Sequence, residues 1–107
     1  SDPRLRGYAS YIARQVVNKE SQAIARQARH FADDGAGWQE WVKGFYAELA
    51  VDLTDKCQVP PAVAAAYAGR WQEQLLNSNA GLAETWQAQK SEELTALMLG
   101  ATMEEIV

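Results

Sequence analysis

The sequence predicts an all-α fold, a compact antiparallel array of four helices joined by short loops. Three observations support this prediction. Apolar residues recur at helical spacing in four segments, and Gly- or Pro-containing turns separate those segments. The chain has 107 residues, of which 48% are hydrophobic, so it is long and apolar enough to form one domain with its own core.

The first helix is expected over residues 8–32. At about 100° per residue, its apolar side chains fall within one arc and its basic side chains lie opposite. The acidic and glycine-rich segment 33–37 then ends the helix. The apolar arc contains Ile12, Val16, Val17, Ile24 and Phe31, and the basic side contains Arg14, Lys19, Arg26 and Arg29.

Glu20 is the exception in this helix, because it lies near the centre of the apolar arc. A carboxylate in such a place is costly unless it is paired or hydrogen-bonded. Three explanations remain open. Glu20 pairs with a basic side chain of another helix, for which Arg70 is the first choice; it points into a partner chain; or the helix ends or bends early and leaves it solvated.

The second helix is expected over residues 38–57, and the rest of the chain is predicted to pack around it. Large aromatic side chains bury about 150–250 Å² each, so the rings of this helix supply much of a small core. On this interpretation the side chain of Trp41 is buried. The predicted apolar face contains Trp38, Trp41, Val42, Phe45, Tyr46, Leu49, Leu53 and Cys57.

Two further helices complete the predicted array. Pro60 and Pro61 begin the third, since proline is tolerated in a first turn, and residues 77–81 form a loop. The fourth covers residues 82–100, and its apolar stripe includes two charged residues, Lys90 and Glu93. Beyond it, Thr102-Met103-Glu104-Glu105 has the spacing of a capping box, which predicts the start of a short fifth helix. The inner face of the third helix contains Val63, Ala64, Tyr67, Ala68, Trp71 and Leu75.

Charge is distributed unevenly along the chain. The formal net charge is −4, but residues 1–31 carry +4 and residues 32–107 carry −8. One interpretation is that a basic helix packs among acidic helices. The other is that Arg14, Lys19, Arg26 and Arg29 form a surface for DNA or an acidic partner. Six basic residues in the first segment fall short of a basic domain.

Catalytic motifs are missing from the sequence, so we expect no enzymatic activity, no cofactor and no metal site. The single histidine, His30, is interpreted as a surface or capping residue, and the single cysteine, Cys57, as a small core hydrophobe. Asp33 and Asp34 lack the further ligands of a calcium loop. No apolar run is long enough to span a membrane.

The order of motifs resembles a known family. Val17-Asn18-Lys19-Glu20 on a basic helix is followed by an acidic and glycine-containing loop, by Trp38, Trp41-Val42 and Phe45-Tyr46, and then by Ala62 and Ala66-Tyr67-Ala68. This pattern, over residues 10–76, is similar to the helical region C-terminal to the core of some tailed-bacteriophage portal proteins, often encoded in prophages. These are packing motifs, and residues 77–107 match nothing in that region.

The resemblance implies a structural role in virion assembly through contacts with portal or capsid-assembly proteins. It also implies that residues 1–107 are one helical domain cut from a larger chain, oligomeric in its full-length context. The implied location is the bacterial cytoplasm before assembly and the virion afterwards. Two other functions stay open: a generic helical adaptor that binds a protein partner through its fourth helix and C-terminal tail, and a DNA-contacting module that uses the basic first helix.

Overall fold

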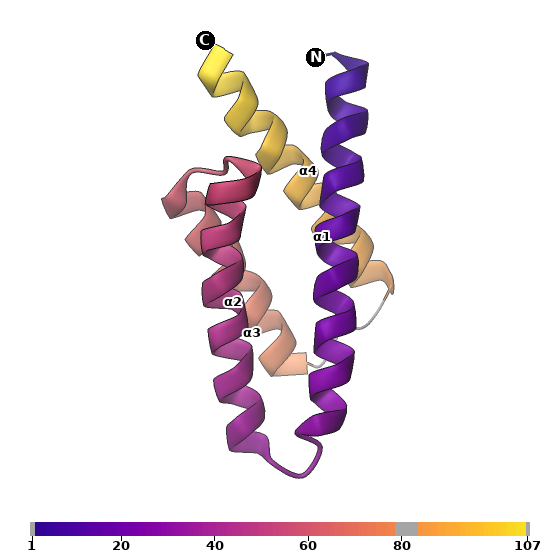
Figure 1. Cartoon of the computed structure of the whole chain (residues 1–107), viewed down its shortest axis with the longest axis vertical. Helices are drawn as coiled ribbons and strands as arrows, with labels where there is room; N and C mark the ends of the chain where they lie inside the picture. The colour runs from indigo at the N-terminus through magenta and orange to yellow at the C-terminus, as the bar shows by residue number, and fades with distance from the viewer. Residues whose placement is uncertain (1, 79–83, 107) are drawn as a thin grey trace.

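A computed structural model describes residues 2–78 and 84–106, the side chains of Ser78 and residues 101–106 excepted. The described residues form four helices and no strand (Figure 1). The predicted all-α four-helix fold is confirmed. The helices are α1 (Pro3–His30), α2 (Gly35–Cys57), α3 (Pro61–Ser78) and α4 (Glu84–Ile106).

Local sequence explains where α1 and α2 begin and end. The Asp2 carboxylate accepts a hydrogen bond of 2.9 Å from the Arg4 backbone N–H, and the Asp34 carboxylate accepts one of the same length from Gly37. Both are N-caps that satisfy free N–H groups of a first helical turn. At the other end of α2, Gln58 adopts a left-handed conformation with φ of 60°, which stops the helix before Pro60.

The predicted boundaries differ from the structure at several helix ends. α1 covers Pro3–His30 where residues 8–32 were predicted, and α2 begins at Gly35 and not at residue 38, because the N-caps Asp2 and Asp34 start both helices earlier. Asn77 and Ser78, predicted in a loop, belong to the last turn of α3, and residues 79–83 lie outside the described residues. The helix predicted to begin at Thr102 is instead the end of α4, which continues to Ile106 without a break. The capping-box spacing was therefore misleading, because the preceding residues already form a helix whose backbone runs on through Thr102.

The four helices form two layers. In the view of Figure 1, α1 and α2 lie side by side in front, while α3 and the first half of α4 lie behind them. The closest packing is between α2 and α3 and between α1 and α4. The molecule measures 49 × 25 × 18 Å between Cα atoms. Its broad face, seen in Figure 1, is therefore formed largely by α1 and α2.

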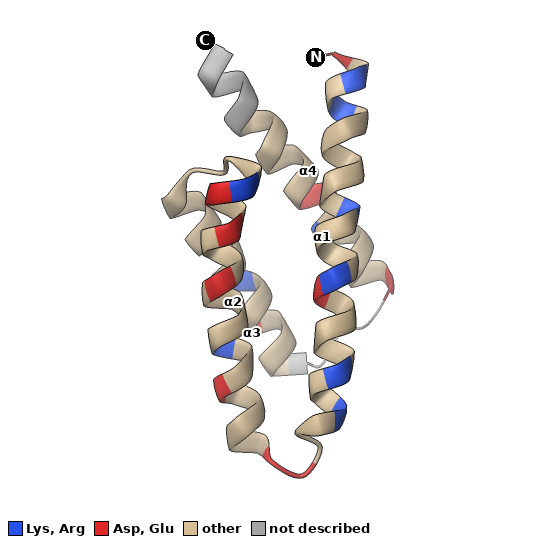
Figure 2. Cartoon of the chain, viewed as in Figure 1, with Lys and Arg blue, Asp and Glu red and all other residues tan. Residues whose placement is uncertain are grey.

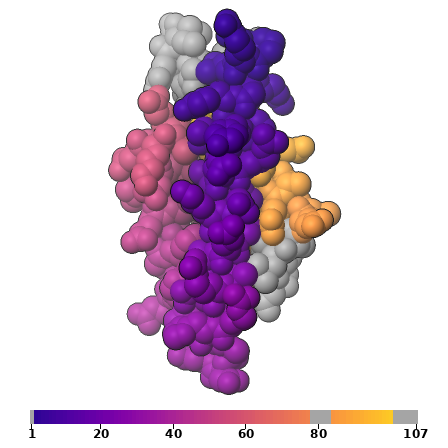
Figure 3. All heavy atoms as spheres, turned by 45° about the vertical axis from the view of Figure 1, so that its right-hand side comes forward, coloured from indigo at the N-terminus to yellow at the C-terminus, as the bar shows by residue number. Residues whose placement is uncertain are grey.

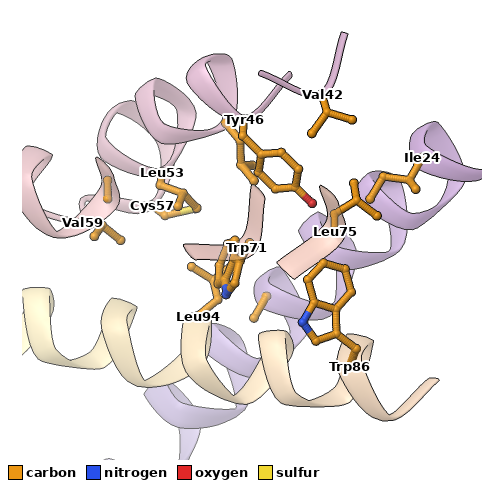
Figure 4. Close-up of a cluster of buried hydrophobic side chains, with 13 residues drawn as sticks. Ile24, Val42, Tyr46, Leu53, Cys57, Val59, Trp71, Leu75, Trp86 and Leu94 are labelled. Atoms are coloured by element: carbon orange, nitrogen blue, oxygen red, sulfur yellow. The ribbon is translucent and has the colours of Figure 1, made fainter. Parts of the chain in front are cut away.

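The core lies between the two layers (Figure 4). Two tryptophans are at its centre, Trp71 with 1% of its surface exposed and Trp86 with 8%. Of the rings predicted to be buried in α2, only that of Tyr46 is fully so. The other core residues are Ala13, Ile24, Val42, Leu49, Leu53, Cys57, Val59, Ala64, Leu75 and Leu94.

The remaining aromatic rings of α2 form a partly buried stack along one edge of the core. Trp38 stacks on Trp41 with ring centroids 5.8 Å apart, and Trp41 stacks on Phe45 at 4.9 Å. All three pack against the core cluster and keep part of their surface in solvent. The prediction that the Trp41 side chain is buried was therefore wrong in degree, because part of its surface stays in solvent.

Candidate functional site

The most unusual group in the interior is Glu20, whose side chain is 2% exposed. The Tyr46 hydroxyl of α2 donates a hydrogen bond of 2.5 Å to its Oε2 atom. The Lys90 ammonium of α4 forms an ion pair and a hydrogen bond with its Oε1 atom. One carboxylate of α1 therefore links two other helices, and both of its oxygens have a partner.

Lys90 is as deeply buried as the carboxylate, with 1% of its side chain exposed. Its Nζ atom also lies 3.6 Å from the centroid of the Trp86 ring, close enough for a cation–π contact. The Trp86 indole N–H in turn donates a hydrogen bond of 2.7 Å to the Gln74 side-chain oxygen on α3. A chain of polar contacts thus runs from α2 through α1 and α4 to α3. We call Glu20, Tyr46, Lys90 and Trp86 the buried polar cluster.

The predicted pair between Glu20 and Arg70 was wrong in its partner. Glu20 does pair with a base from another helix, but that base is Lys90, because α1 packs on α4. Arg70 is exposed on α3, where its Nη2 atom lies 3.4 Å from the Glu93 Oε1 atom of α4. The other Glu93 oxygen accepts a hydrogen bond of 2.9 Å from the Trp71 indole N–H. The two charged residues that interrupted the predicted apolar stripe of α4 thus each have a partner on another helix.

Burial controls protonation in this cluster. Burial raises the pKa of Tyr46 well above its ordinary range, and the neighbouring Glu20 carboxylate raises it further. Burial lowers the pKa of Lys90, and the same carboxylate opposes that change by favouring the ammonium form. The Tyr46 hydroxyl and the Lys90 ammonium group both donate hydrogen bonds to the Glu20 carboxylate. This arrangement fixes the relative positions of three helices.

A groove of about 390 Å³ lies between α1 and α2, and Glu20 is among the residues that line it. Its walls are mostly apolar and its rim is charged. The apolar walls include Val16, Ala23, Phe45, Leu49 and Leu53, and the rim carries Lys19, Glu48, Asp52 and Lys56. We use the term α1–α2 face for this groove together with its charged rim, on which Lys19 and Glu48 are exposed.

The predicted basic residues do not form one patch on this face, because Lys19 lines the α1–α2 groove whereas Arg14 lines a separate groove between α1 and α4. Arg14, Lys19, Arg26 and Arg29 are all exposed on α1. Figure 2 shows basic residues along α1 and mainly acidic residues along the neighbouring α2. Two helices of opposite charge therefore lie side by side, a pattern that the sequence alone does not reveal.

Other candidate chemistry is sparse in the part of the chain that the structure describes. No group of three or more His, Cys, Asp or Glu side chains there is placed to hold a metal ion. Cys57 is buried, which raises the pKa of its thiol. Within the same described ranges, no helix has the length and apolar character needed to cross a membrane.

Comparisons with known proteins leave the chain without an assigned family. No protein-family model matches it, and neither the curated proteins nor the solved structures contain a significant match. The resemblance to portal proteins therefore remains a prediction from the sequence motifs.

Proposed function

We propose that this chain is a non-enzymatic assembly domain that binds another protein through its α1–α2 face. The observation that supports this most directly is the stack of Trp38, Trp41 and Phe45, which keeps part of its surface in solvent beside an apolar groove with a charged rim. Protein interfaces typically combine aromatic anchors, an apolar centre and a polar rim. Arg26 and Glu40 add exposed charge on the same two helices.

The state of the buried polar cluster supports a structural role for the interior. A general acid or base has to reach a substrate, whereas Glu20 and Lys90 are almost completely buried and already paired with each other. Tyr46 donates its hydroxyl hydrogen to the same carboxylate. The cluster therefore serves to hold the helices in register, and the surface is left to carry the function.

Virion assembly is the context that we propose for this binding. The motifs that resemble the portal region fall on α1, α2 and α3, and they include both ends of the Glu20–Tyr46 hydrogen bond and the whole aromatic stack. If the resemblance holds, portal, terminase, scaffold or capsid proteins are the partners. If it does not, the chain is a helical adaptor for another protein.

A photo-crosslinking experiment tests this proposal. A benzoylphenylalanine is placed at Glu48, which is exposed and lines the groove of the α1–α2 face, or at Gly69, exposed on α3 with open space around it, and each variant is expressed in the bacterium that carries the gene. We expect a discrete adduct from position 48 and none from position 69. A phage assembly protein in the adduct supports the virion context, and a different partner contradicts it. Equal adducts from both positions, or none from either, contradict the use of this face.

DNA contact is the second candidate, because Arg14, Lys19, Arg26 and Arg29 are all exposed on one helix. The acidic residues of the neighbouring α2 work against it, since they repel phosphate. A duplex gel shift at about 50 mM and about 200 mM salt separates the two functions, because phosphate contacts weaken steeply over that range. A salt-sensitive shift that Arg14→Glu abolishes supports DNA contact, and the lack of a shift at either concentration excludes it.

A further inference from the structure

The outer side of α1 has an unusual composition. At about 100° per residue, nine residues of this helix fall within one arc of about 100°, and all nine are exposed. The buried residues of α1 lie on the opposite side of the helix. We call the nine residues the outer strip of α1: Arg4, Tyr8, Tyr11, Gln15, Asn18, Lys19, Gln22, Arg26 and Arg29.

The outer strip contains neither a carboxylate nor an aliphatic side chain. Its members are four cations, two tyrosines and three amides. Protein interfaces usually have an apolar centre, which this strip lacks. Surfaces that bind nucleic acid combine cations and amides, which contact phosphates, with aromatic rings, on which bases stack. The composition therefore favours nucleic acid over an acidic protein as the partner of this surface.

The two tyrosines of the strip, Tyr8 and Tyr11, expose 65% and 53% of their surface. Every other Phe, Tyr and Trp of the chain is at least partly buried. The two residues are three positions apart, so they are neighbours on the helix surface. The aromatic pairs of the described residues all involve other rings. Two adjacent rings are therefore left in solvent, where bases can stack on them.

Unpaired positive charge follows toward the other end of the strip. Lys19, Arg26 and Arg29 take part in none of the ion pairs among the described residues, whereas Arg4 lies 3.7 Å from Asp2. With a rise of 1.5 Å per residue, Tyr8 and Arg29 are about 32 Å apart along the helix axis. Figure 3 shows α1 running down the front of the molecule along its whole length. The strip is thus a long open surface with rings at one end and positive charge at the other.

We propose that the outer strip of α1 binds single-stranded nucleic acid, with bases stacked on Tyr8 and Tyr11 and phosphates beside the cations. A duplex would meet only the cations, because its bases already stack on one another. Single-strand binding surfaces combine both kinds of contact, at about 4–16 nucleotides per site. Of the strip residues only Lys19 lines the groove of the α1–α2 face, so this binding does not depend on the proposed protein contact.

Fluorescence anisotropy of a labelled oligothymidylate of about 15 nucleotides tests this binding with the whole chain. An abasic oligomer of the same length is the second probe, because it keeps the phosphates and lacks the bases. One double variant removes the rings (Tyr8→Ala/Tyr11→Ala), and another keeps them without the hydroxyls (Tyr8→Phe/Tyr11→Phe). Circular dichroism checks that each variant is folded.

Two further variants test the charges. The strip variant neutralises three cations of the outer strip (Lys19→Gln, Arg26→Gln, Arg29→Gln). The matched control neutralises three exposed cations outside the strip (Arg6→Gln, Arg14→Gln, Lys43→Gln). Both variants lose three positive charges, so they differ only in where the charge is removed.

The expected results separate stacking from charge. Binding of oligothymidylate to the unaltered chain should weaken with salt at a log–log slope of about −2, as three phosphate contacts with a single strand predict. The Ala double variant should bind it at least about fivefold more weakly, and the Phe double variant should bind it like the unaltered chain. Neither should change binding of the abasic oligomer. The strip variant should lose affinity for both probes, and the control should keep it.

Several results would overturn this inference. One is an unaltered chain that binds no oligothymidylate at about 50 mM salt, where phosphate contacts are strong. Another is an Ala double variant that binds as well as the unaltered chain. Equal losses in the strip variant and the control would reveal attraction by net charge alone. Tighter binding of a duplex, or of polyglutamate, would assign the cations to duplex DNA or to an acidic protein. A protein adduct from position 48 would still leave the proposed function standing.

Discussion

The interior of this protein and its α1–α2 face contain the same kinds of side chain in opposite circumstances. Inside, Glu20 and Lys90 are buried and pair with each other, and Trp86 contacts the ammonium group. On the face, Lys19 and Glu48 are exposed without an ion pair in the described structure. Charged and aromatic residues therefore have two roles in this protein. The buried ones fix the arrangement of the helices, and the exposed ones remain available to a partner.

Removing one partner of the buried ion pair should have the largest effect on the stability of the protein. Glu20→Gln leaves the Lys90 ammonium buried beside a neutral amide, which we expect to lower the free energy of unfolding by about 3–5 kcal/mol. The double variant Glu20→Gln/Lys90→Met should lose much less than the sum of the two single variants. Urea denaturation of all four proteins measures the coupling, and additive losses would show that the two groups do not interact.

The tryptophans give a matched test of burial. Trp71 is 1% exposed and its indole N–H bonds Glu93, so Trp71→Ala should cost about 3–5 kcal/mol of unfolding free energy. Trp41 is partly exposed, and Trp41→Ala should cost less than half as much. Denaturation of the two variants side by side measures this difference. Equal losses would mean that the aromatic stack belongs to the core as fully as Trp71 does.

The Tyr46 hydroxyl makes the free energy of unfolding depend on pH. Tyr46→Phe removes a hydrogen bond to a charged group, which we expect to cost about 1.5–3 kcal/mol near neutral pH. The pKa of Tyr46 is raised in the folded chain above its ordinary value of 10.0, so above that pH the unfolded chain loses the proton and the folded chain keeps it.

The unaltered protein therefore loses stability as pH rises above about 10, by up to about 1.4 kcal/mol per pH unit from this group, whereas the Tyr46→Phe variant lacks this loss. The stability gap between the two proteins should then narrow with rising pH in denaturation experiments. A gap that is constant up to about pH 11 would show that Tyr46 titrates alike in both states.

The smallest expected effect concerns the ion pair at the surface. Arg70 is half exposed where it meets Glu93 at 3.4 Å, and solvent screens such pairs. Arg70→Met should therefore change the free energy of unfolding by less than about 1 kcal/mol. A loss as large as that of Glu20→Gln would mean that the Arg70–Glu93 pair is as important to the fold as the buried pair.

Much of the fold follows from apolar spacing and from turn residues. They predicted four helices, placed Cys57 at the end of the second one and singled out Glu20 as a carboxylate on an apolar arc that is costly unless it is paired or hydrogen-bonded. The partner was missed because the assignment started from Arg70, on the edge of a helical face, although Lys90 interrupts an apolar stripe in the same way as Glu20 does. An acidic residue on the apolar face of one helix and a basic residue on the apolar face of another together predict a buried ion pair between them.

The α1–α2 face is harder to predict from the sequence. Helical periodicity locates the basic side of α1 and the acidic side of α2, but it does not say which of those residues meet at the groove between the two helices. The degree of burial along the aromatic edge of α2 is also a property of the packing. It depends on how the other helices cover that arc, and Trp38 and Trp41 are left partly exposed.

The most direct test of this division is the same substitution made in both regions. Lys90→Met removes the buried ammonium and leaves the Glu20 carboxylate unpaired, whereas Lys19→Met removes an exposed ammonium one residue away from that carboxylate along α1. In urea denaturation we predict a loss of about 3–5 kcal/mol for Lys90→Met and a change within about 0.5 kcal/mol for Lys19→Met. Similar values for the two variants would contradict the account.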